Sequence, residues 1–341
     1  MLRSNSRPTL VAAVAAALSL PAPLLADTFG DSLDFDLYSS LRLHYESVNP
    51  DGADRYGGFR DAYSRIGFTA SATLDEGVSA FAQLEIPLDL ANGAVQDPFD
   101  NDEDIRVARL GLNSSLGTLL YGQDWMPYYN AIAYPVDMFS SYYSGFATFT
   151  AFRLNESLIY YSPDMNGFSL GASYSRAGGY GKADGGSDDR YQLTASYRWG
   201  ETTLAAGIDE VGGSESWRFY GASLMHTIDN LYIGAKLEYI DSEQQAAGFG
   251  RDGDTVVNLY AGYTVGKNTF KGMIAEVDGY GGSVFHLGVD HDLSDYLTLF
   301  AEYYNESEGA AIPTRKARDG APLDAFGGGG DAFLAGVRMS F

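Results

Sequence analysis

The sequence predicts an all-β protein, built as a sixteen-stranded antiparallel transmembrane β-barrel. Three observations lead to this prediction. Segments in which apolar and polar residues alternate recur along the chain, and this period of two is typical of strands. The composition, with 41 Gly, 25 Tyr and 14% aromatic residues, favours many short strands joined by tight turns. The first 26 residues have the pattern of an export signal.

The export signal is predicted at residues 1–26. Two arginines form a basic start, an apolar stretch follows from Leu10 to Leu20, and Ala26 ends the segment. The apolar stretch is too short to span a bilayer, so a secretory signal peptide is favoured over a membrane anchor. No change in composition marks a linker after it, and residues 27–341 are expected to form one barrel.

The charge and the cysteine count exclude several classes of protein. A formal net charge of −23 argues against nucleic acid as a partner, since phosphate binding needs clustered Lys and Arg. Cys is absent, so an exported chain of this size must be stabilised by its hydrogen-bonded sheet, as a closed barrel can be. After the signal no run of 18 apolar residues occurs, and no membrane-spanning helix is predicted. No cofactor is predicted.

The strands are recognised one by one from the alternation. In the segment 190–199, Leu193 and Tyr197 share one face while Gln192 and Arg198 share the other. Turn signals such as PDMNG, TIDN and VGKN separate strands at one rim, and long segments rich in Gly and acid separate them at the other. These patterns predict sixteen strands, at residues 34–46, 64–74, 78–88, 105–113, 117–123, 153–161, 168–176, 190–199, 202–209, 216–227, 231–241, 255–265, 269–278, 284–291, 296–304 and 331–341.

A soluble β-sandwich is the alternative to a membrane barrel. Tyr191 and Trp199, like Phe333 and Phe341, occupy the two ends of an apolar face and are eight residues apart. At ~3.3 Å per residue and a tilt of ~40°, eight steps climb roughly 20 Å, enough with the rings to bracket a lipid-facing band of about 25 Å. A sandwich gains nothing from aromatic residues at both strand ends, so the barrel is favoured.

Several segments carry a family resemblance. DLYSSLRLHY, YSRIGFTASATLDEGVSAFAQLE, VARLGLNSSLGTLLYGQD and FRLNESLIYYSPDMNGFSLGASY, together with the terminal aromatic, resemble the general diffusion porins of Gram-negative outer membranes. The likeness covers the N-terminal half of the mature chain, and the remainder by strand rhythm. It implies a water-filled channel in the outer membrane for passive diffusion of small hydrophilic solutes and ions.

The resemblance also implies partners. Members of this family are homotrimers that contact outer-membrane lipid and lipopolysaccharide. In that family a C-terminal phenylalanine that closes an alternating strand is read by the outer-membrane assembly machinery, and Phe341 matches it. The third long loop folds into the barrel and narrows the channel, and the matching segment here is the aromatic stretch 123–152.

The family lines one wall of the constriction with arginine. Arg65, Arg109 and Arg153 match those positions. Arg42 alternates with the apolar Leu41 and Leu43, so it too is expected on the lumen side of its strand. An arginine that faced lipid would cost ~2–4 kcal/mol near the midplane. A purely structural role, in which these arginines pair with lumen carboxylates, is an equal alternative to a selective one.

The family places acids opposite the arginines, on the inward loop. Asp137 is the best match here and Asp124 the second. Gln123 stands where the family often has arginine, and the usual proline-glutamate turn is missing, so the acidic side is thin. Four arginines against two acids predict a weak preference for anions, or near neutrality, in the constriction.

Other functions are weighed against a channel. His286 and Asp290 share a strand face and could form a triad with a serine, as in an outer-membrane hydrolase, but a polar lumen lining is the simpler interpretation. A surface adhesin and a porin that prefers one anion or small nutrient are the further alternatives. The acidic segment 97–104 could hold a divalent ion, but it lacks the glycine and the spacing of an EF-hand loop.

Overall fold

Antiparallel strands make up most of the computed structural model, which describes residues 33–98, 105–176, 189–212, 216–242, 250–312 and 328–341. The predicted signal peptide and most of the acidic segment 97–104 lie outside the described residues. The strand segments are β1 (Leu33–Pro50), β2 (Tyr56–Asp61), β3 (Ser64–Asp75), β4 (Val78–Leu88), β5 (Val107–Ser114), β6 (Gly117–Trp125), β7 (Arg153–Tyr161), β8 (Phe168–Ser175), β9 (Arg190–Trp199), β10 (Thr202–Val211), β11 (Trp217–Ile228), β12 (Leu231–Ser242), β13 (Thr255–Val265), β14 (Asn268–Val277), β15 (Gly282–Ser294), β16 (Leu297–Glu306) and β17 (Gly330–Ser340).

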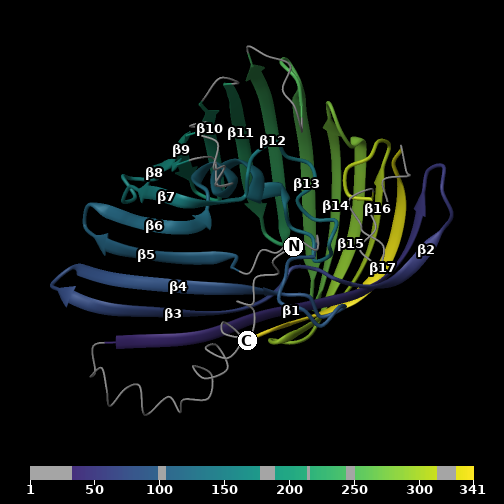
Figure 1. Cartoon of the computed structure of the whole chain (residues 1–341), viewed down its shortest axis with the longest axis horizontal. Coiled ribbons are helices and arrows are strands. Elements are labelled where there is room, and N and C mark those ends of the chain that lie inside the picture. Colours follow the sequence, from purple (N-terminus) through teal and green to yellow (C-terminus); the bar gives the residue numbers. More distant parts are fainter. Residues whose placement is uncertain (1–32, 99–104, 177–188, 213–215, 243–249, 313–327) are drawn as a thin grey trace, which may run out of the picture.

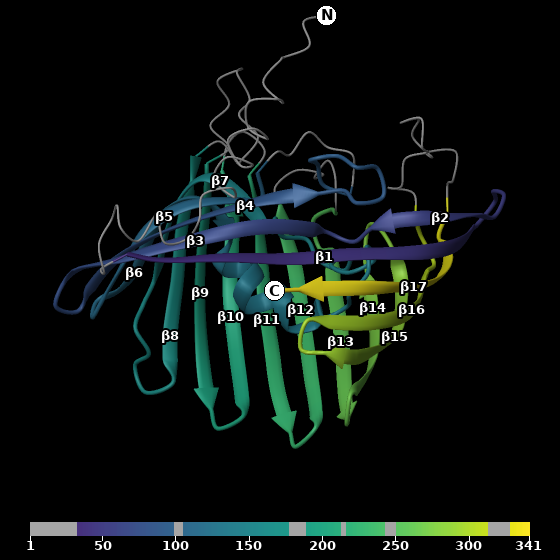
Figure 2. The same ribbon diagram turned by 90° about the horizontal axis from the view of Figure 1, so that it is seen from below.

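The sheet closes on itself. From β3 onward each strand pairs with the next one in the chain, and β1 pairs with both β3 and β17. No edge is left open in this ring, so every strand has a partner on each side, as a bilayer requires. Figures 1 and 2 show the strands following one another around the barrel. The predicted barrel is confirmed, with its strands close to the predicted positions.

We call each full-length strand position around the barrel a stave. The second stave, beside β1, is broken into two segments. Both β2 and β3 pair with β1, and they are separated by Ala62 and Tyr63. Tyr63 has φ 66°, a left-handed conformation that interrupts the ladder. Counted as staves, the barrel therefore has the sixteen strands that were predicted. The segment β2 was missed because its sequence, YGGFRD, has two glycines after its first residue and therefore a low strand propensity.

The barrel is apolar outside and polar inside. On β12, Leu237 is 49% exposed on the outer face, whereas the neighbouring Lys236 and Glu238 are 3% and 0% exposed inside. The same contrast holds on β14, where Ile274 is exposed outward and Lys271 is buried. A soluble sandwich would bury the apolar face instead, so this polarity is that of a barrel in lipid.

The aromatic residues predicted at strand ends are on the outer face. Tyr191 is 51% and Trp199 77% exposed at the two ends of β9. Phe341 follows β17, and its backbone carbonyl accepts a hydrogen bond of 2.8 Å from the Ser39 N–H, so the last residue still takes part in the closure of the sheet.

One long segment, residues 126–152 between β6 and β7, lies inside the ring. It contains the short helices η1 (Tyr129–Ala133) and η2 (Tyr134–Val136), which Figure 1 shows within the barrel. Its aromatic residues join the inward side chains of the wall in one core. We call residues 126–152 the inward loop. No helix in the described ranges is long and apolar enough to cross a membrane.

Candidate functional site

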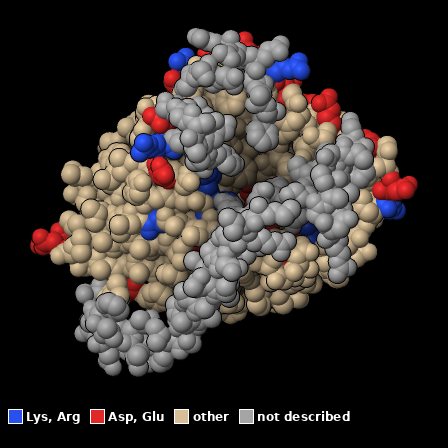
Figure 3. All heavy atoms as spheres, viewed as in Figure 1, with Lys and Arg blue, Asp and Glu red and all other residues tan. Residues whose placement is uncertain are grey.

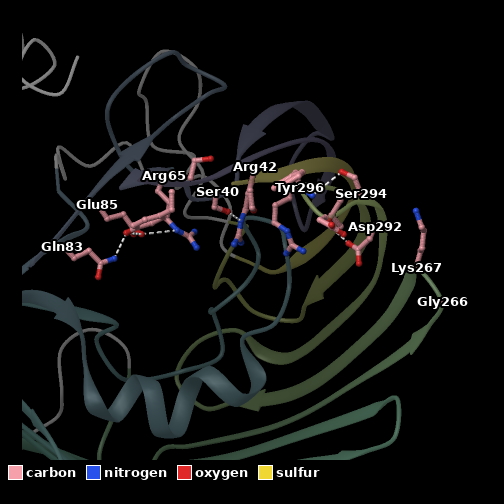
Figure 4. A pocket seen from close by; sticks show the side chains of 16 residues that line it. Ser40, Arg42, Arg65, Gln83, Glu85, Gly266, Lys267, Asp292, Ser294 and Tyr296 are labelled. Carbon is pink, nitrogen blue, oxygen red and sulfur yellow. Dashed lines mark hydrogen bonds and ion pairs between the residues drawn. The ribbon is translucent and has the colours of Figure 1, made fainter. Parts of the chain in front are cut away.

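The four arginines predicted for the channel wall lie on one side of the barrel, two of them on the adjacent strands β1 and β3 and two farther along on β5 and β7. Arg42 is on β1, Arg65 on β3, Arg109 on β5 and Arg153 is the first residue of β7. Arg42 and Arg65 line a cavity of about 660 Å³ inside the barrel. Figure 4 shows both side chains directed into this space, with Glu85 beside Arg65.

Strand register explains why Arg42 and Arg65 come together. Arg65 is paired with Ser40, two residues before Arg42 on the same face of β1. The Arg42 Nε donates to Ser40 Oγ at 3.0 Å, which directs the guanidinium toward Arg65. The backbone of Arg42 is fixed by Ser64, whose Oγ accepts from the Arg42 N–H at 2.7 Å. Ser64 can make this bond because the stave breaks just before it.

Glu85 on β4 neutralises part of the arginine group. Its carboxylate lies 3.4 Å from Arg65 Nε and 2.9 Å from Arg106 Nε, and it accepts a hydrogen bond from Tyr38 Oη at 3.0 Å. One acid is therefore shared by two guanidinium groups. Counted over the described residues, one carboxylate faces two guanidinium groups, so this group has a positive excess.

Arg109 and Asp124 form a pair of their own. Arg109 Nη1 lies 2.5 Å from Asp124 Oδ2, and the carboxylate is buried. Asp124 is on β6, in the barrel wall, rather than on the inward loop across from the arginines. The negative charge of Asp124 is thus paired with Arg109.

Arg153 is placed against an aromatic ring. Its guanidinium carbon lies 4.8 Å from the centre of the Trp125 ring, and that of Arg106 lies 6.0 Å from the same ring. Trp125 in turn contacts Tyr129 of the inward loop, with ring centres 4.6 Å apart. Arg153 and Arg106 are therefore linked to the base of the inward loop through cation–π contacts with Trp125.

Asp137 lies within the inward loop, directly after η2. Its carboxylate accepts a hydrogen bond of 2.7 Å from Tyr129 Oη and another from Ser144 Oγ. Burial and the neighbouring Asp137 carboxylate raise the pKa of Tyr129 well above its ordinary value, so the phenol stays protonated and donates. Both hydrogen bonds are internal to the loop and stabilise its fold.

The inward loop is bound to the opposite half of the wall by buried acids. Glu302 accepts from the Ser140 N–H at 2.8 Å, Glu238 accepts from the Phe149 N–H at 3.2 Å, and Asp209 accepts from Thr150 Oγ1 at 2.8 Å. These acids belong to β16, β12 and β10. Because they are covered by the loop and used as hydrogen-bond acceptors, they are withdrawn from the channel.

The predicted set missed Arg338, which joins Arg42 and Arg65 as the third arginine among the described residues that line the cavity. It lines the same cavity and stands directly opposite Arg42 in the register of β1 with β17. Its lumen-facing parity on the last strand was visible in the sequence. Its neighbour was not, because β1 and β17 become adjacent only when the barrel closes. Arg106 was also missed, since it lies just outside the regular alternation, before β5.

Comparisons with known proteins give the family. The sequence model of the Gram-negative porin family matches residues 9–310. The chain is a Gram-negative porin. It lies in the outer membrane and forms a diffusion channel for small hydrophilic solutes and ions, so the family, function and location predicted from the sequence are confirmed. In a comparison with curated proteins, no sequence matched the chain.

Solved structures of similar fold agree with this assignment. An anion-selective porin from Comamonas acidovorans superposes with a TM-score of 0.69 and 18% identity, covering 91% of this chain and 100% of that one. A Salmonella typhi OmpF complex with daunomycin gives 0.68 and 16%, covering 91% and 98%. The trimer form of in-vitro folded OmpT from Vibrio cholerae gives 0.62 and 15%, covering 91% and 100%. At these identities the likeness shows the fold.

The interior of the porin is thus divided into two halves. The half formed by β17, β1, β3, β5 and β7 carries arginine, and the half formed by β10 to β16 carries acids that bind the inward loop. Figure 3 shows this face of the molecule hollowed near its centre, with basic side chains at the edge of the hollow.

Proposed function

We propose that this porin is a general diffusion channel with a weak preference for anions, set by the arginines of one half of its wall. The observation that carries the proposal is the pair Arg42 and Arg338. They oppose each other in the strand register and line one cavity. Among the described residues no carboxylate lies within ion-pair distance of Arg42, and Arg338 shares its acid with a lysine.

The acids of the cavity explain why the preference is weak. Glu85, Asp292 and Asp295 line it together with Arg42, Arg65, Lys267 and Arg338. Asp292 and Asp295 lie toward the rim of short turns, whereas Glu85 is already shared by two arginines. Charges at the rim are screened beyond a Debye length of ~8 Å at physiological salt, while charges in the confined channel are screened less. The arginines therefore dominate at the narrow part.

The roles of the individual predicted residues belong to this proposal. Arg42 and Arg65 act as the cavity-lining charges of the constriction, while Arg109, tied to Asp124, and Arg153, stacked on Trp125, hold the wall and the base of the loop. Asp137 acts within the loop. Selectivity and structural support are then divided among the arginines instead of being alternatives for all of them.

The channel is proposed to work without catalysis. His286 and Asp290 were weighed as members of a triad. His286 Nε2 lies 3.0 Å from Glu302 Oε2 and its ring stacks on Phe139, and within the described part of the chain no serine hydroxyl is bonded to it. Asp290 is occupied by Lys271 and Arg338. A nucleophile activated by this histidine has no place in such packing.

The assembly is proposed to be a homotrimer, in contact with lipid and lipopolysaccharide and delivered by the outer-membrane assembly machinery. A trimeric structure among the similar folds supports the first point. The exposed apolar outer face, which includes Leu110 and Leu193, supports contact with lipid or with a second subunit. Chemical cross-linking in native outer membranes, followed by sizing of the products, tests the trimer.

The selectivity is tested by reversal potentials in planar bilayers. We expect the parent channel in a potassium chloride gradient to favour chloride weakly. Replacing both Arg42 and Arg338 with Ala should move the reversal potential toward that of a potassium-preferring channel. Replacing Arg218, which lies on the outer surface in an exposed pair with Glu210, is the control and should change nothing. A double variant with the parental potential would contradict the proposal.

A further inference from the structure

At its tip the inward loop places one hydroxyl group, that of Ser140, against Arg338 of the arginine half of the wall. Ser140 is fully buried, and its Oγ donates to Asp290 Oδ2 at 3.2 Å. The same oxygen accepts from Arg338 Nη1 at 3.1 Å and from Lys271 Nζ at 3.4 Å. A hydroxyl has one proton to donate and two lone pairs to share, so this one is saturated.

The loop tip that carries this hydroxyl is firmly held. The Ser140 N–H is bound by Glu302, and the carbonyl of Met138 accepts from Lys271 Nζ at 3.0 Å. Phe139 between them stacks on His286, with ring centres 3.5 Å apart. The Ser140 hydroxyl therefore has a fixed position with respect to the wall.

Arg338 is kept apart from its acid by this hydroxyl. Arg338 Nη2 lies 3.8 Å from Asp290 Oδ2, whereas Lys271 Nζ lies 2.7 Å from the same oxygen. A direct charge-assisted hydrogen bond between a guanidinium and a carboxylate is about 2.7–2.9 Å long. The other oxygen, Asp290 Oδ1, is buried and has no hydrogen-bond partner among the described residues, so the acid has room for a closer contact.

We propose that Ser140 acts as a spacer that positions Arg338, and that Ser140 and Asp290 together set how much positive charge the channel presents beside Arg42. This inference rests on the proposed anion preference and assigns its control to the inward loop. With the hydroxyl in place, Asp290 is committed mainly to the buried Lys271, and the partly exposed Arg338 keeps most of its charge for the channel.

Two substitutions should shift selectivity in opposite directions. In Ser140→Ala the spacer is lost, Arg338 closes on Asp290, and the ratio of chloride to potassium permeability should fall by about two-fold or more. In Asp290→Asn the acid is lost, Arg338 and Lys271 are uncompensated, and the ratio should rise by about two-fold or more. Both ratios are obtained from reversal potentials in a potassium chloride gradient, with folded barrel first verified by heat modifiability on gels.

Matched controls separate this effect from damage to the loop. Ser141→Ala removes the neighbouring buried hydroxyl, which accepts from the Tyr143 N–H, and should keep the parental potential. Ser140→Thr keeps a hydroxyl group at this position and should have the parental reversal potential. Asp209→Asn removes another buried wall acid that binds the loop, paired with Arg190 on the far side, and should leave selectivity unchanged.

The role of Arg338 is tested by combining substitutions. In a channel that already carries Arg338→Ala, adding Ser140→Ala should have no further effect on the reversal potential. Suppose that Arg338→Ala shifts the reversal potential but that Ser140→Ala and Asp290→Asn do not shift it in opposite directions. The spacer role of Ser140 is then wrong, and the proposed function stands. If Arg338→Ala itself leaves the parental potential, both the spacer and the role of Arg338 in selectivity are wrong.

Discussion

Arg42 on β1 and Arg338 on β17 occupy directly opposed positions of one antiparallel strand pair, and both line the channel cavity. Like charges placed directly opposite each other destabilise a strand pair. The arrangement is tolerated here because the two guanidinium groups face an open polar cavity and because Asp290 and Ser140 lie on the far side of Arg338. The positive charge is a feature of the channel surface rather than of the packing.

Arg65, which the proposal assigns to selectivity, is tested together with Arg109 and Arg153, which it assigns to support of the wall and the loop. We expect the combined replacement of Arg65, Arg109 and Arg153 by Ala to move the reversal potential toward cations in a potassium chloride gradient. Two unit charges 4 Å apart interact by about 4 kcal/mol at an effective dielectric of 20, so losing them changes the local potential strongly. Since the change leaves the buried Asp124 without its partner, folded yield is measured first.

The control for this triple variant is Arg198→Ala. Arg198 is exposed, with Asp164 as its partner at 3.1 Å, close to a short turn at the rim. Its loss should leave the reversal potential unchanged. A triple variant with the parental potential would show that these three arginines have a structural role alone.

The inward loop should limit conductance. Deleting residues 130–145 removes η2, all of η1 except Tyr129, and the tip, which fill space inside the ring. We expect single-channel conductance to rise, provided that heat-modifiable barrel is still recovered. An unchanged conductance in correctly folded channels would place the loop outside the ion path.

The last residue should matter for assembly. Deleting Phe341 should lower the amount of heat-modifiable barrel in outer membranes, because a terminal aromatic closes the alternating strand in this family. Phe270→Ala is the matched control, since Phe270 and Phe341 are both 53% exposed on the outer face. Equal yields for the two variants under high expression would argue against a specific assembly signal.

The break in the second stave should stabilise the loop. Tyr63, in the left-handed conformation, donates from Oη to the Tyr142 carbonyl at 2.8 Å and stacks on the Tyr142 ring with centres 5.9 Å apart. Tyr63→Phe keeps the ring and removes the hydrogen bond, so we expect a loss of about 1 kcal/mol in the free energy of unfolding.

That loss is measured as a shift of the urea midpoint for the folded band in lipid vesicles. Tyr121→Phe is the control, because Tyr121 is exposed on the outer face of β6 and should leave the midpoint in place. Equal midpoints for the parent and Tyr63→Phe would show that the stacking alone holds the loop tip.

Much of the fold follows from local pattern. Alternation with a period of two places each strand and tells which side chains face lipid, as Leu237 and Lys236 show on β12. It also gives Arg42, Arg65 and Arg109 their inward direction, because an arginine on the outer face would cost too much in hydrocarbon. These features depend on neighbours in the chain, so they could be predicted. Even there β2 was missed, because its two glycines weaken the pattern.

The partners of the channel residues depend on contacts between distant parts of the chain. Arg338 meets Arg42 because barrel closure brings the last strand beside the first, and Glu85 serves two arginines because of the register of β3, β4 and β5. The Ser140 hydroxyl lies between Asp290 and Arg338 and is hydrogen-bonded to both, although Ser140 is 150 residues from Asp290 in the sequence. Sequence parity gives the direction of a side chain, whereas register, closure and the path of the inward loop fix which charges remain uncompensated, since these depend on distances that no local pattern contains.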